Sequence, residues 1–558
     1  MSILLCLPEE IMLHVLVLLG PSDVRSCRML CRALNNLVAG SPQLLFSLAL
    51  DSLGYTYPSV PRPDLTPFES LKLLKDHYHN WLHPNNIKPT KYGLRARSTS
   101  SKYVGGVYAQ SIGASSFLGM NSVISGLEFY QVPSRNSGTE FKYWHLDMNQ
   151  RVHDYIFDPD QDLLILLELP NPTTQYSATC TVHLRTMGEN KVHPRALAPI
   201  MTADFTNNEG FEGSVPNWSY HFEIMGELLG ILFRSRSREL ASWVIIWDWV
   251  RGIEVTRTPS VGGWHSSFIL LDQRALLLPR SNDPRYVGNL TKSSTFGSIE
   301  VLRFDPKTNT STPPRVVSTF CLPSSNQKYV RSTLKIRCTP NVRPMDWSRG
   351  APKAYEPSSE YPLIAIDVNL SQFQGTAQIN ESAGILYVPT STFLHSERYS
   401  EDSSRLQTFI KNFYTSSVLE VPWYKWAHHT SWVDTGNTQP HNGCLMYGCR
   451  TGTLSNRVGM MDPANEIHLL DFNHRRLKKV QPELPKILEM NVETGYLGLV
   501  FNNGNSFAEA EYTETTLEVE DGVDTFDEVI LDDEHVIVVR KASDSLEMHL
   551  LPPLTQTS

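Results

Sequence analysis

The pattern of apolar and polar residues divides the chain into a short helical start and a long region of strands. Between Leu7 and Leu45, apolar residues recur every three or four positions, which is the spacing of one helical face. Beyond residue 96, short runs of β-branched, aromatic and Leu residues alternate with Gly, Pro, Asn and Ser, as in strands joined by turns. The pattern therefore predicts an α+β multidomain chain, with a small trihelical N-terminal unit followed by a large all-β domain.

Local signals place the first helices. Residues 7–11 (Leu-Pro-Glu-Glu-Ile) open a helix, because proline is tolerated in the first turn and acidic residues suit the positive end of the helix dipole. Gly20-Pro21 ends it, and Ser22 and Asp23 predict an N-cap for the next helix. Residues 40–42 (Gly-Ser-Pro) end the helical pattern. A unit of about 45 residues is small for an independent core, so we expect it to gain stability from a partner or from the rest of the chain.

The strand region contains a coarse repeat. Strands that end in an aromatic residue or Leu followed by Asp recur, as at Trp247-Asp248, Phe304-Asp305 and Leu470-Asp471. A repeat of roughly 40–60 residues favours a β-propeller of about six to eight blades. A pair of β-sandwiches is the alternative.

A connector joins the two parts. It is rich in Pro and then becomes helical, with Leu71, Leu74 and Tyr78 on one face. Three histidines follow at 77, 79 and 83; we interpret them as solvated residues at a helix end, because no Cys or carboxylate completes a metal site nearby. The predicted boundaries are 1–50 for the helical unit, 51–95 for the connector and 96–558 for the propeller-like domain.

Composition and charge exclude several classes of protein. The 558 residues carry a formal net charge of −9, with 41% hydrophobic and 19% charged residues, which is an ordinary globular composition. A mildly acidic balance argues against a general nucleic-acid binder, whose phosphate contacts need a basic face.

No run of about 18 apolar residues predicts a membrane helix, and the start lacks the basic segment of a signal peptide. The eight cysteines include no Cys-x-x-Cys pair and read as idle or buried thiols of a reducing compartment. We therefore expect a cytoplasmic or nuclear protein that binds neither membrane nor nucleic acid.

The first forty-five residues resemble an F-box. The resemblance is carried by Leu-Pro-Glu-Glu-Ile-Met-Leu-His-Val-Leu at 7–16, Asp23-Val24, Cys-Arg-Met-Leu-Cys-Arg-Ala-Leu-Asn at 27–35, and Ser41-Pro42. The main departure is at 44–46, where Leu-Leu-Phe replaces the Trp that often follows the Ser-Pro.

This resemblance implies a partner and a surface. F-box units bind a Skp-family adaptor, which links them to a cullin scaffold in a ubiquitin ligase, by docking apolar side chains into a helical groove. The core interpretation is strong for Leu16, Leu30 and Leu34, because an amphipathic helix needs a core in any case. Contact is favoured for Leu7 and Pro8, which lie outside the core periodicity. The implied contact or contact-supporting residues are Leu7, Pro8, Ile11, Leu13, Leu16, Leu30, Cys31 and Leu34.

Two later stretches sharpen the resemblance. Residues 154–168 contain Asp-x-x-Gln-Asp-Leu-Leu, and residues 224–252 contain Trp-Asp-Trp-x-x-Gly. Both are similar to phrases of F-box proteins from mushroom-type fungi, and Trp81 resembles the Trp that ends a Leu-rich helix in those proteins. The resemblance fades beyond about residue 310.

Nothing in the sequence predicts catalysis or a cofactor. No phosphate-binding loop, His-Glu-x-x-His or Gly-x-Ser-x-Gly motif occurs. Asp158, Asp160 and Asp162 lack the Gly and Glu that a calcium loop needs, so we expect a polar turn. We therefore predict no catalytic residue, no metal and no cofactor.

Three segments are candidates for recognition. Trp423, Trp426 and Trp432 are expected to pack between blades; an aromatic patch that faces a substrate is the weaker alternative. The acidic stretch 509–534 reads as an exposed insertion, with contact to a basic partner as the alternative. The basic cluster 475–479 reads as a solvated turn, with a nuclear import signal as the alternative.

The function predicted on these grounds is that of a substrate-recognition subunit in a Skp–cullin–F-box ubiquitin ligase. The F-box would dock the adaptor, and the propeller would bind a protein substrate whose identity the sequence does not reveal. Such a subunit works by proximity rather than by its own chemistry. The alternatives are a propeller hydrolase with an incidental helical N-terminus and an F-box scaffold that acts outside any ligase.

Overall fold

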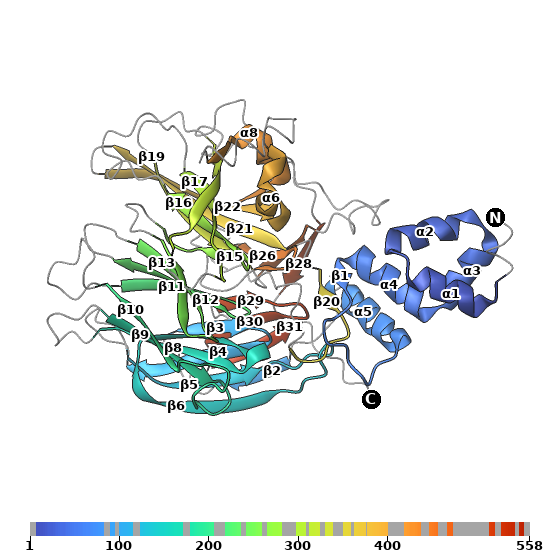
Figure 1. The fold of residues 1–558 in the computed structure, drawn as a ribbon, viewed down its shortest axis with the longest axis horizontal. Coiled ribbons are helices and arrows are strands. Elements are labelled where there is room, and N and C mark those ends of the chain that lie inside the picture. The colour runs from blue at the N-terminus through green and yellow to red at the C-terminus, as the bar shows by residue number, and fades with distance from the viewer. Residues whose placement is uncertain are drawn as a thin grey trace.

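The structure, a computed structural model, separates into a helical unit and a large β domain (Figure 1). It describes residues 7–82, 90–94, 100–114, 123–170, 179–205, 218–235, 242–258, 265–281, 297–307, 312–323, 330–338, 350–358, 362–374, 377–399, 418–436, 446–455, 466–472, 513–518, 526–541 and 546–551.

The helical unit has four helices where the sequence pattern predicted three. They are α1 (Glu9–Val17), α2 (Pro21–Leu30), α3 (Arg32–Gly40) and α4 (Pro42–Leu53). The fourth forms because the side chain of Ser41 accepts a hydrogen bond from Leu44 N at its start, and Gly54 ends it in the left-handed conformation with φ 77°. A cluster that includes Leu16, Val24, Leu34, Val38 and Leu44 forms its core.

The predicted N-cap of the second helix is wrong. α2 begins at Pro21, with Gly20 in the capping position and no side-chain capping hydrogen bond, so Ser22 and Asp23 already lie inside the helix. Pro21 explains the difference, because its fixed φ suits the first helical position and its missing N–H needs no partner there.

The connector contains a short strand and a long helix. β1 (Tyr55–Thr56) pairs with β20 (Glu356–Pro357) from the β domain. α5 (Pro67–Leu82) begins with a reciprocal cap, in which the Glu69 carboxylate accepts from Thr66 N at 2.7 Å and Glu69 N donates to the Thr66 hydroxyl.

The described strands of the β domain form seven sheets of four or five strands. Blade 1 contains β3 (Ser101–Val104), β4 (Val107–Ala114), β5 (Val123–Gln131) and β6 (Lys142–Val152); blade 2 contains β7 (Asp154–Asp158), β8 (Leu163–Glu168), β9 (Thr179–Thr186) and β10 (Ile200–Asp204). Blade 3 contains β11 (Trp218–Met225), β12 (Leu228–Ser235), β13 (Ser242–Asp248) and β14 (Ile253–Arg257); blade 4 contains β15 (Ile269–Asp272), β16 (Ala275–Ser281), β17 (Gly297–Arg303), β18 (Arg315–Cys321) and β23 (Leu419–Val421).

The remaining three sheets complete the set. Blade 5 contains β19 (Val330–Arg337), β21 (Leu363–Gln374), β22 (Ala377–Pro389) and β24 (Ser431–Gly436); blade 6 contains β25 (Met446–Tyr447), β26 (Arg450–Ser455), β27 (Glu466–Asp471) and β28 (Thr513–Glu518); blade 7 contains β29 (Phe526–Leu531), β30 (Val536–Lys541), β31 (Leu546–Leu551) and β2 (Thr90–Leu94).

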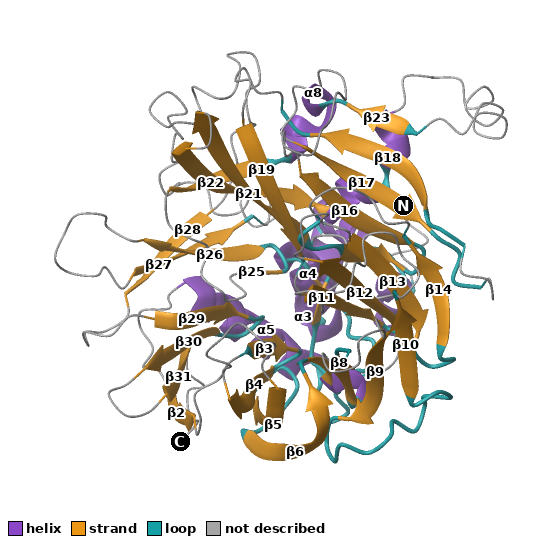
Figure 2. Cartoon of the chain, turned by 90° about the vertical axis from the view of Figure 1, so that its left-hand side faces the viewer, coloured by secondary structure: helices purple, strands orange, loops and turns teal. Residues whose placement is uncertain are grey.

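The sheets are arranged as a β-propeller. Neighbouring strands within the blades are antiparallel, except for β23, which adds to the edge of blade 4 in a parallel direction. Figure 2 views the ring from the side opposite the helices and shows the sheets arranged around a centre. Within the described residues the blade number is seven, inside the predicted range, and the alternative of two β-sandwiches does not fit. β2, from the connector, pairs with β31 and so closes the ring.

A separate hydrophobic cluster fills each of the seven interfaces between neighbouring blades. Strand β8 illustrates why its sequence is continuously apolar. Leu163, Ile165 and Leu167 pack toward blade 3, whereas Leu164 and Leu166 pack toward blade 1. Because successive side chains of a strand point to opposite faces, a strand between two other blades needs apolar residues at every position.

Candidate adaptor-binding surface and its joint with the propeller

The residues predicted to contact an adaptor divide by exposure. Leu7, Pro8, Ile11 and Leu30 are exposed, and the exposed fraction of Leu30 reaches 60%. Pro8 also begins α1, since its carbonyl accepts from Ile11 N and Met12 N, both at 3.1 Å. These four side chains are available to a partner.

The other four predicted residues support this surface from within. Leu16 and Leu34 are buried in the core of the helical unit, at 3% and 4% exposure, and Leu13 and Cys31 are half-buried against the same core. Leu16 and Leu34 therefore correspond to the core interpretation, whereas that interpretation is wrong for Leu30, which is exposed.

The structure adds exposed apolar residues that sequence reasoning missed. Leu18 and Met29 are 87% and 81% exposed, and Val15 and Val17 are also exposed. Helix α1 is apolar on several sides, so periodicity alone did not separate its buried face from its free face. Figure 1 shows α1, α2 and α3 at the end of the molecule away from the propeller.

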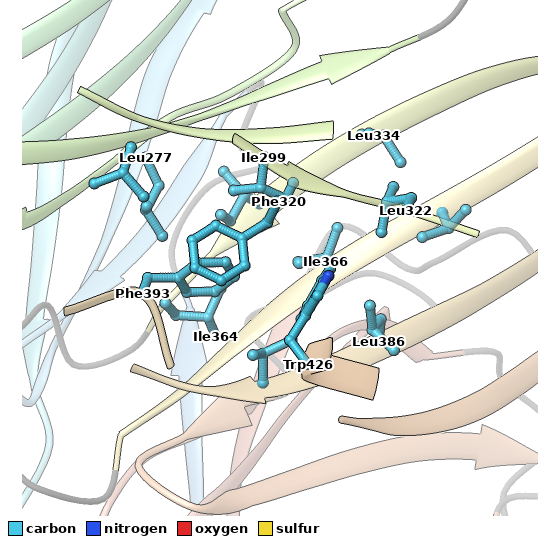
Figure 3. Close-up of a cluster of buried hydrophobic side chains, with 14 of the residues drawn as sticks. Leu277, Ile299, Phe320, Leu322, Leu334, Ile364, Ile366, Leu386, Phe393 and Trp426 are labelled. Atoms are coloured by element: carbon cyan, nitrogen blue, oxygen red, sulfur yellow. The ribbon is translucent and has the colours of Figure 1, made fainter. Parts of the chain in front are cut away.

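The three tryptophans considered as a substrate patch lie inside the protein. Trp426 is fully buried, and Trp423 and Trp432 are 5% exposed, in the cluster between blades 4 and 5. The ring of Trp426 meets that of Phe320 edge-on at 5.5 Å, and its indole N–H donates to Cys321 O at 3.1 Å (Figure 3). Their placement corresponds to packing between blades, and their rings are not presented to a partner.

The Asp-x-x-Gln-Asp-Leu-Leu and Trp-Asp-Trp-x-x-Gly stretches join blades 2 and 3. The Gln161 side chain donates to Asp158 Oδ2 at 2.7 Å and to Gly226 O at 2.9 Å, and the Trp249 indole donates to the same carbonyl at 2.9 Å. The guanidinium of Arg195 lies 4.9 Å from the Trp249 ring centroid. The Asp-rich segment is a short 3-10 turn, as expected, and these motifs have a structural role.

A buried joint attaches the helices to the propeller. Tyr55 Oη donates to Asp533 Oδ1 at 2.9 Å and lies 2.7 Å from His77 Nε2. Because the single hydroxyl hydrogen of Tyr55 points to Asp533, His77 Nε2 is the donor to the Tyr55 oxygen. Trp81 Nε1 donates to Asp533 O at 2.9 Å, and the guanidinium of Arg450 lies 4.5 Å from the Trp81 ring centroid. One residue of blade 7 thus receives hydrogen bonds from both β1 and α5.

The turn that carries Asp533 is held by its neighbours. Asp532 Oδ1 accepts from Glu534 N and His535 N, and Asp532 also accepts the Tyr103 hydroxyl from blade 1. Burial alone would raise the pKa of Asp532, but His535 and the Tyr103 hydroxyl together outweigh burial and hold that pKa below its usual value. Burial alone would lower the pKa of His535, but Asp532, Glu534 and Asp533 together outweigh burial and raise it. The two residues therefore form a buried ion pair.

Burial also acts on the neighbouring carboxyls. It raises the pKa of Asp533 against the lowering influence of Arg450, and it raises the pKa of Glu534 against that of His535. Glu534 Oε1 accepts from the backbone N–H groups of Arg135 and Asn136 in blade 1, each at 3.1 Å.

A segment of blade 5 also contacts the connector. Residues 350–358 follow β19 and reach the connector, where Lys353 N donates to Val60 O at 2.9 Å and Arg62 N donates to Lys353 O at 3.1 Å. The Asn136 side chain binds the backbone of this segment through Ala354 N, Tyr355 N and Tyr355 O. Tyr355 packs edge-on against Tyr55, so polar and apolar contacts coincide.

Two expectations are corrected at the joint. His77 is buried and hydrogen-bonded rather than solvated, although His79 is exposed as expected and His83 lies outside the described residues. The acidic stretch is not simply an exposed insertion, because residues 513–518 and 526–531 are strands and Asp532 is buried. The basic cluster 475–479 lies outside the described residues.

The described part of the chain contains no group of three or more His, Cys, Asp or Glu side chains placed to hold a metal. None of its helices combines the length and apolarity that crossing a bilayer requires.

A comparison with models of known protein families gives one match, at the N-terminus. Residues 4–44 match the model of the F-box domain family. These residues are an F-box domain. A search of curated proteins finds no significant match to this chain.

Solved structures similar to the chain include β-propellers. The C-terminal WD40 domain of Sif2 has a TM-score of 0.34 and 9% identity, covering 84% of this chain and 99% of that one. The WD40 domain of SCAP from fission yeast has a TM-score of 0.29 and 8% identity, covering 83% and 98%. The polysaccharide lyase Uly1 has a TM-score of 0.36 and 8% identity, covering 83% and 91%. The propeller architecture here rests on the seven sheets themselves.

Proposed function

We propose that this chain is the substrate-recognition subunit of a Skp–cullin–F-box ubiquitin ligase. The observation that carries the proposal is an F-box domain whose apolar residues Leu7, Ile11, Leu18, Met29 and Leu30 are exposed, although the domain has a buried core of its own. Exposed apolar side chains on short helices are what an adaptor with a helical groove would cover.

The propeller supplies the second half of the proposal. Its joint with the connector occupies one face of the ring, and the opposite face is turned away from the helices (Figure 2). A protein substrate would bind on that opposite face. The ligase would then act by holding the substrate near the ubiquitin-bearing enzyme, without a catalytic residue from this chain. We place this activity in the cytoplasm, the nucleus or both.

Co-purification with a Skp-family adaptor tests the proposal. Wild type should retain the adaptor, and the double variant Leu7→Ala/Pro8→Ala and the single variant Leu30→Asp should each lose most of it. Leu197→Asp is the matched control, because Leu197 is 80% exposed on the propeller and lies outside the F-box. Failure of wild type to bind would reject the proposal, whereas equal binding by all variants would reject the contact residues.

The two other candidate functions give different outcomes. A scaffold outside any ligase would bind the adaptor but would not recruit a cullin. A propeller hydrolase would turn over a substrate without any adaptor. No arrangement of the described residues favours either of them.

A further inference from the structure

The last blade of the propeller both closes the ring and holds the F-box. α5 ends at Leu82, and β2 begins at Thr90 and pairs with β31 over its whole length, from Thr90 opposite Leu550 to Leu94 opposite Leu546. The turn between β29 and β30 in the same blade receives the hydrogen bonds of Tyr55 and Trp81. A single C-terminal segment thus serves two purposes.

The connector contributes a buried side chain to the hydrophobic cluster on each side of blade 7. Trp81 belongs to the hydrophobic cluster between blades 6 and 7, with Val529, Leu531 and Val536. Leu94 of β2 belongs to the cluster between blades 7 and 1. Packed interfaces transmit displacement. Weakening the interface between blades 7 and 1 should therefore shift the strands of blade 7 against which Trp81 packs.

We propose that the placement of the F-box is conditional on closure of the propeller ring, with Asp533 as the positioning residue that couples the two. The consequence of this coupling rests on the proposed function: only a chain with a complete last blade would hold the adaptor and the substrate at a fixed separation. A chain that lacked the blade would keep a folded F-box but lose its fixed orientation.

The turn around Asp533 is suited to this coupling. The backbone carbonyl of Asp533 accepts a hydrogen bond from Trp81 of α5. Its carboxylate accepts one from Tyr55 of β1. Its neighbour Glu534 binds two backbone N–H groups of blade 1, and Asp532 accepts the Tyr103 hydroxyl of the same blade. The same turn is therefore hydrogen-bonded both to the first blade, across the interface that closes the ring, and to the connector.

Native-state hydrogen exchange of the full chain, without adaptor, tests the proposal. Leu550→Ala weakens the seam between blades 7 and 1 and lies outside the cluster that contains Trp81. Leu334→Ala is its matched control, because it opens a buried cavity between blades 4 and 5. We expect Leu550→Ala to speed exchange in β2 and α5 together by at least tenfold, and Leu334→Ala to leave α5 within twofold of wild type.

A second pair of variants isolates Asp533. Tyr55→Phe removes the hydroxyl that binds Asp533 and His77 and keeps the ring. Tyr57→Phe removes a hydroxyl that lies 3.5 Å from Gln43 O within the helical part of the chain. Exchange in α5 should rise at least tenfold in Tyr55→Phe and remain within twofold in Tyr57→Phe.

Two results would overturn the inference. Equal protection of α5 in Leu550→Ala and Leu334→Ala would show that F-box placement does not depend on closure. Equal protection in Tyr55→Phe and Tyr57→Phe would remove Asp533 from its role. If Leu550→Ala does not fold, Ile537→Val in the same cluster replaces it, with Ile364→Val as control. If wild type does not bind the adaptor, the proposed function is rejected, but the coupling between ring closure and F-box placement is not.

Discussion

The indole of Trp81 donates a hydrogen bond to the backbone carbonyl of Asp533, 452 positions further along the chain, at 2.9 Å. The ring is 7% exposed and packs among the strands of blades 6 and 7. The last turn of the connector helix thereby places one ring between two blades of the propeller. The same helix packs through Leu71 and Leu74 against Phe46 and Leu50 of α4, so α5 contacts both the helical unit and the propeller.

Replacing Trp81 should destabilise the protein strongly. Trp81→Ala removes a large buried ring, and such truncations cost about 3–5 kcal/mol. Trp81→Phe keeps most of the packing and loses mainly the hydrogen bond, so its cost should be about 1–2 kcal/mol. Urea unfolding followed by circular dichroism measures both. Equal costs for the two variants would mean that the ring packing contributes little.

The ion pair between Asp532 and His535 should give a defined pH window. The lowered pKa of Asp532 means that its contribution is present above its ordinary value of 3.8 and is lost as the pH falls through the folded pKa. The raised pKa of His535 means that its contribution is present below its ordinary value of 6.5 and is lost as the pH rises through the folded pKa. The difference in melting temperature between wild type and His535→Gln should therefore be greatest between pH 3.8 and 6.5. A difference that stays constant from about pH 3 to 9 would argue against the pair.

His265 should have the opposite effect on acid stability. It is buried, its Nδ1 lies 2.8 Å from Pro279 O, and burial lowers its pKa from 6.5 to about 4. At a pH between these two values, the unfolded chain binds a proton that the native state does not. The free energy of unfolding therefore decreases as the pH is lowered, by about 3 kcal/mol when pH 4 is reached. Unfolding free energies of wild type and His265→Gln at pH 7 and 4.5 measure the effect. Wild type should lose more stability than the variant over this interval, and parallel losses would exclude His265 as the cause.

Gly384 should not tolerate a side chain. A Cβ at this position in β22 would lie 2.0 Å from Cζ2 of Trp432, which is itself packed between blades 4 and 5. Gly384→Ala should therefore displace the ring and lower stability by about 1–3 kcal/mol. Gly93→Ala in β2 is the control, since nothing lies within 4 Å of its Cβ position. Similar melting temperatures for the two variants would contradict the packing described around Trp432.

Local physics explains which parts of the fold the sequence predicted. The helical period predicted the N-terminal helices, although the predicted cap of the second one is wrong. The resemblance to an F-box rested on the order of short motifs within the first 45 or so residues. The propeller was inferred from the spacing of apolar strands, because a blade between two neighbours needs apolar residues on both faces, as at Leu163 to Leu167.

The joint could not be predicted in the same way. Tyr55 and Asp533 are 478 positions apart, and nothing near either of them indicates the other. Asp533 also lies in an acidic stretch, which favours a solvated interpretation until the turn is seen beneath α5. A buried His77 is equally hidden, because its partner Tyr55 comes from a different element of the connector.

The affinity of the purified full-length chain for a purified Skp-family adaptor tests the central claim most directly. Isothermal titration should give a one-to-one complex with a Kd below about 1 µM for wild type. The affinity of Leu30→Asp should fall at least a hundredfold, while that of Leu197→Asp should remain unchanged, because only Leu30 lies on the F-box surface. Absence of measurable binding by folded wild type would contradict the assignment of this chain as an adaptor-bound substrate receptor.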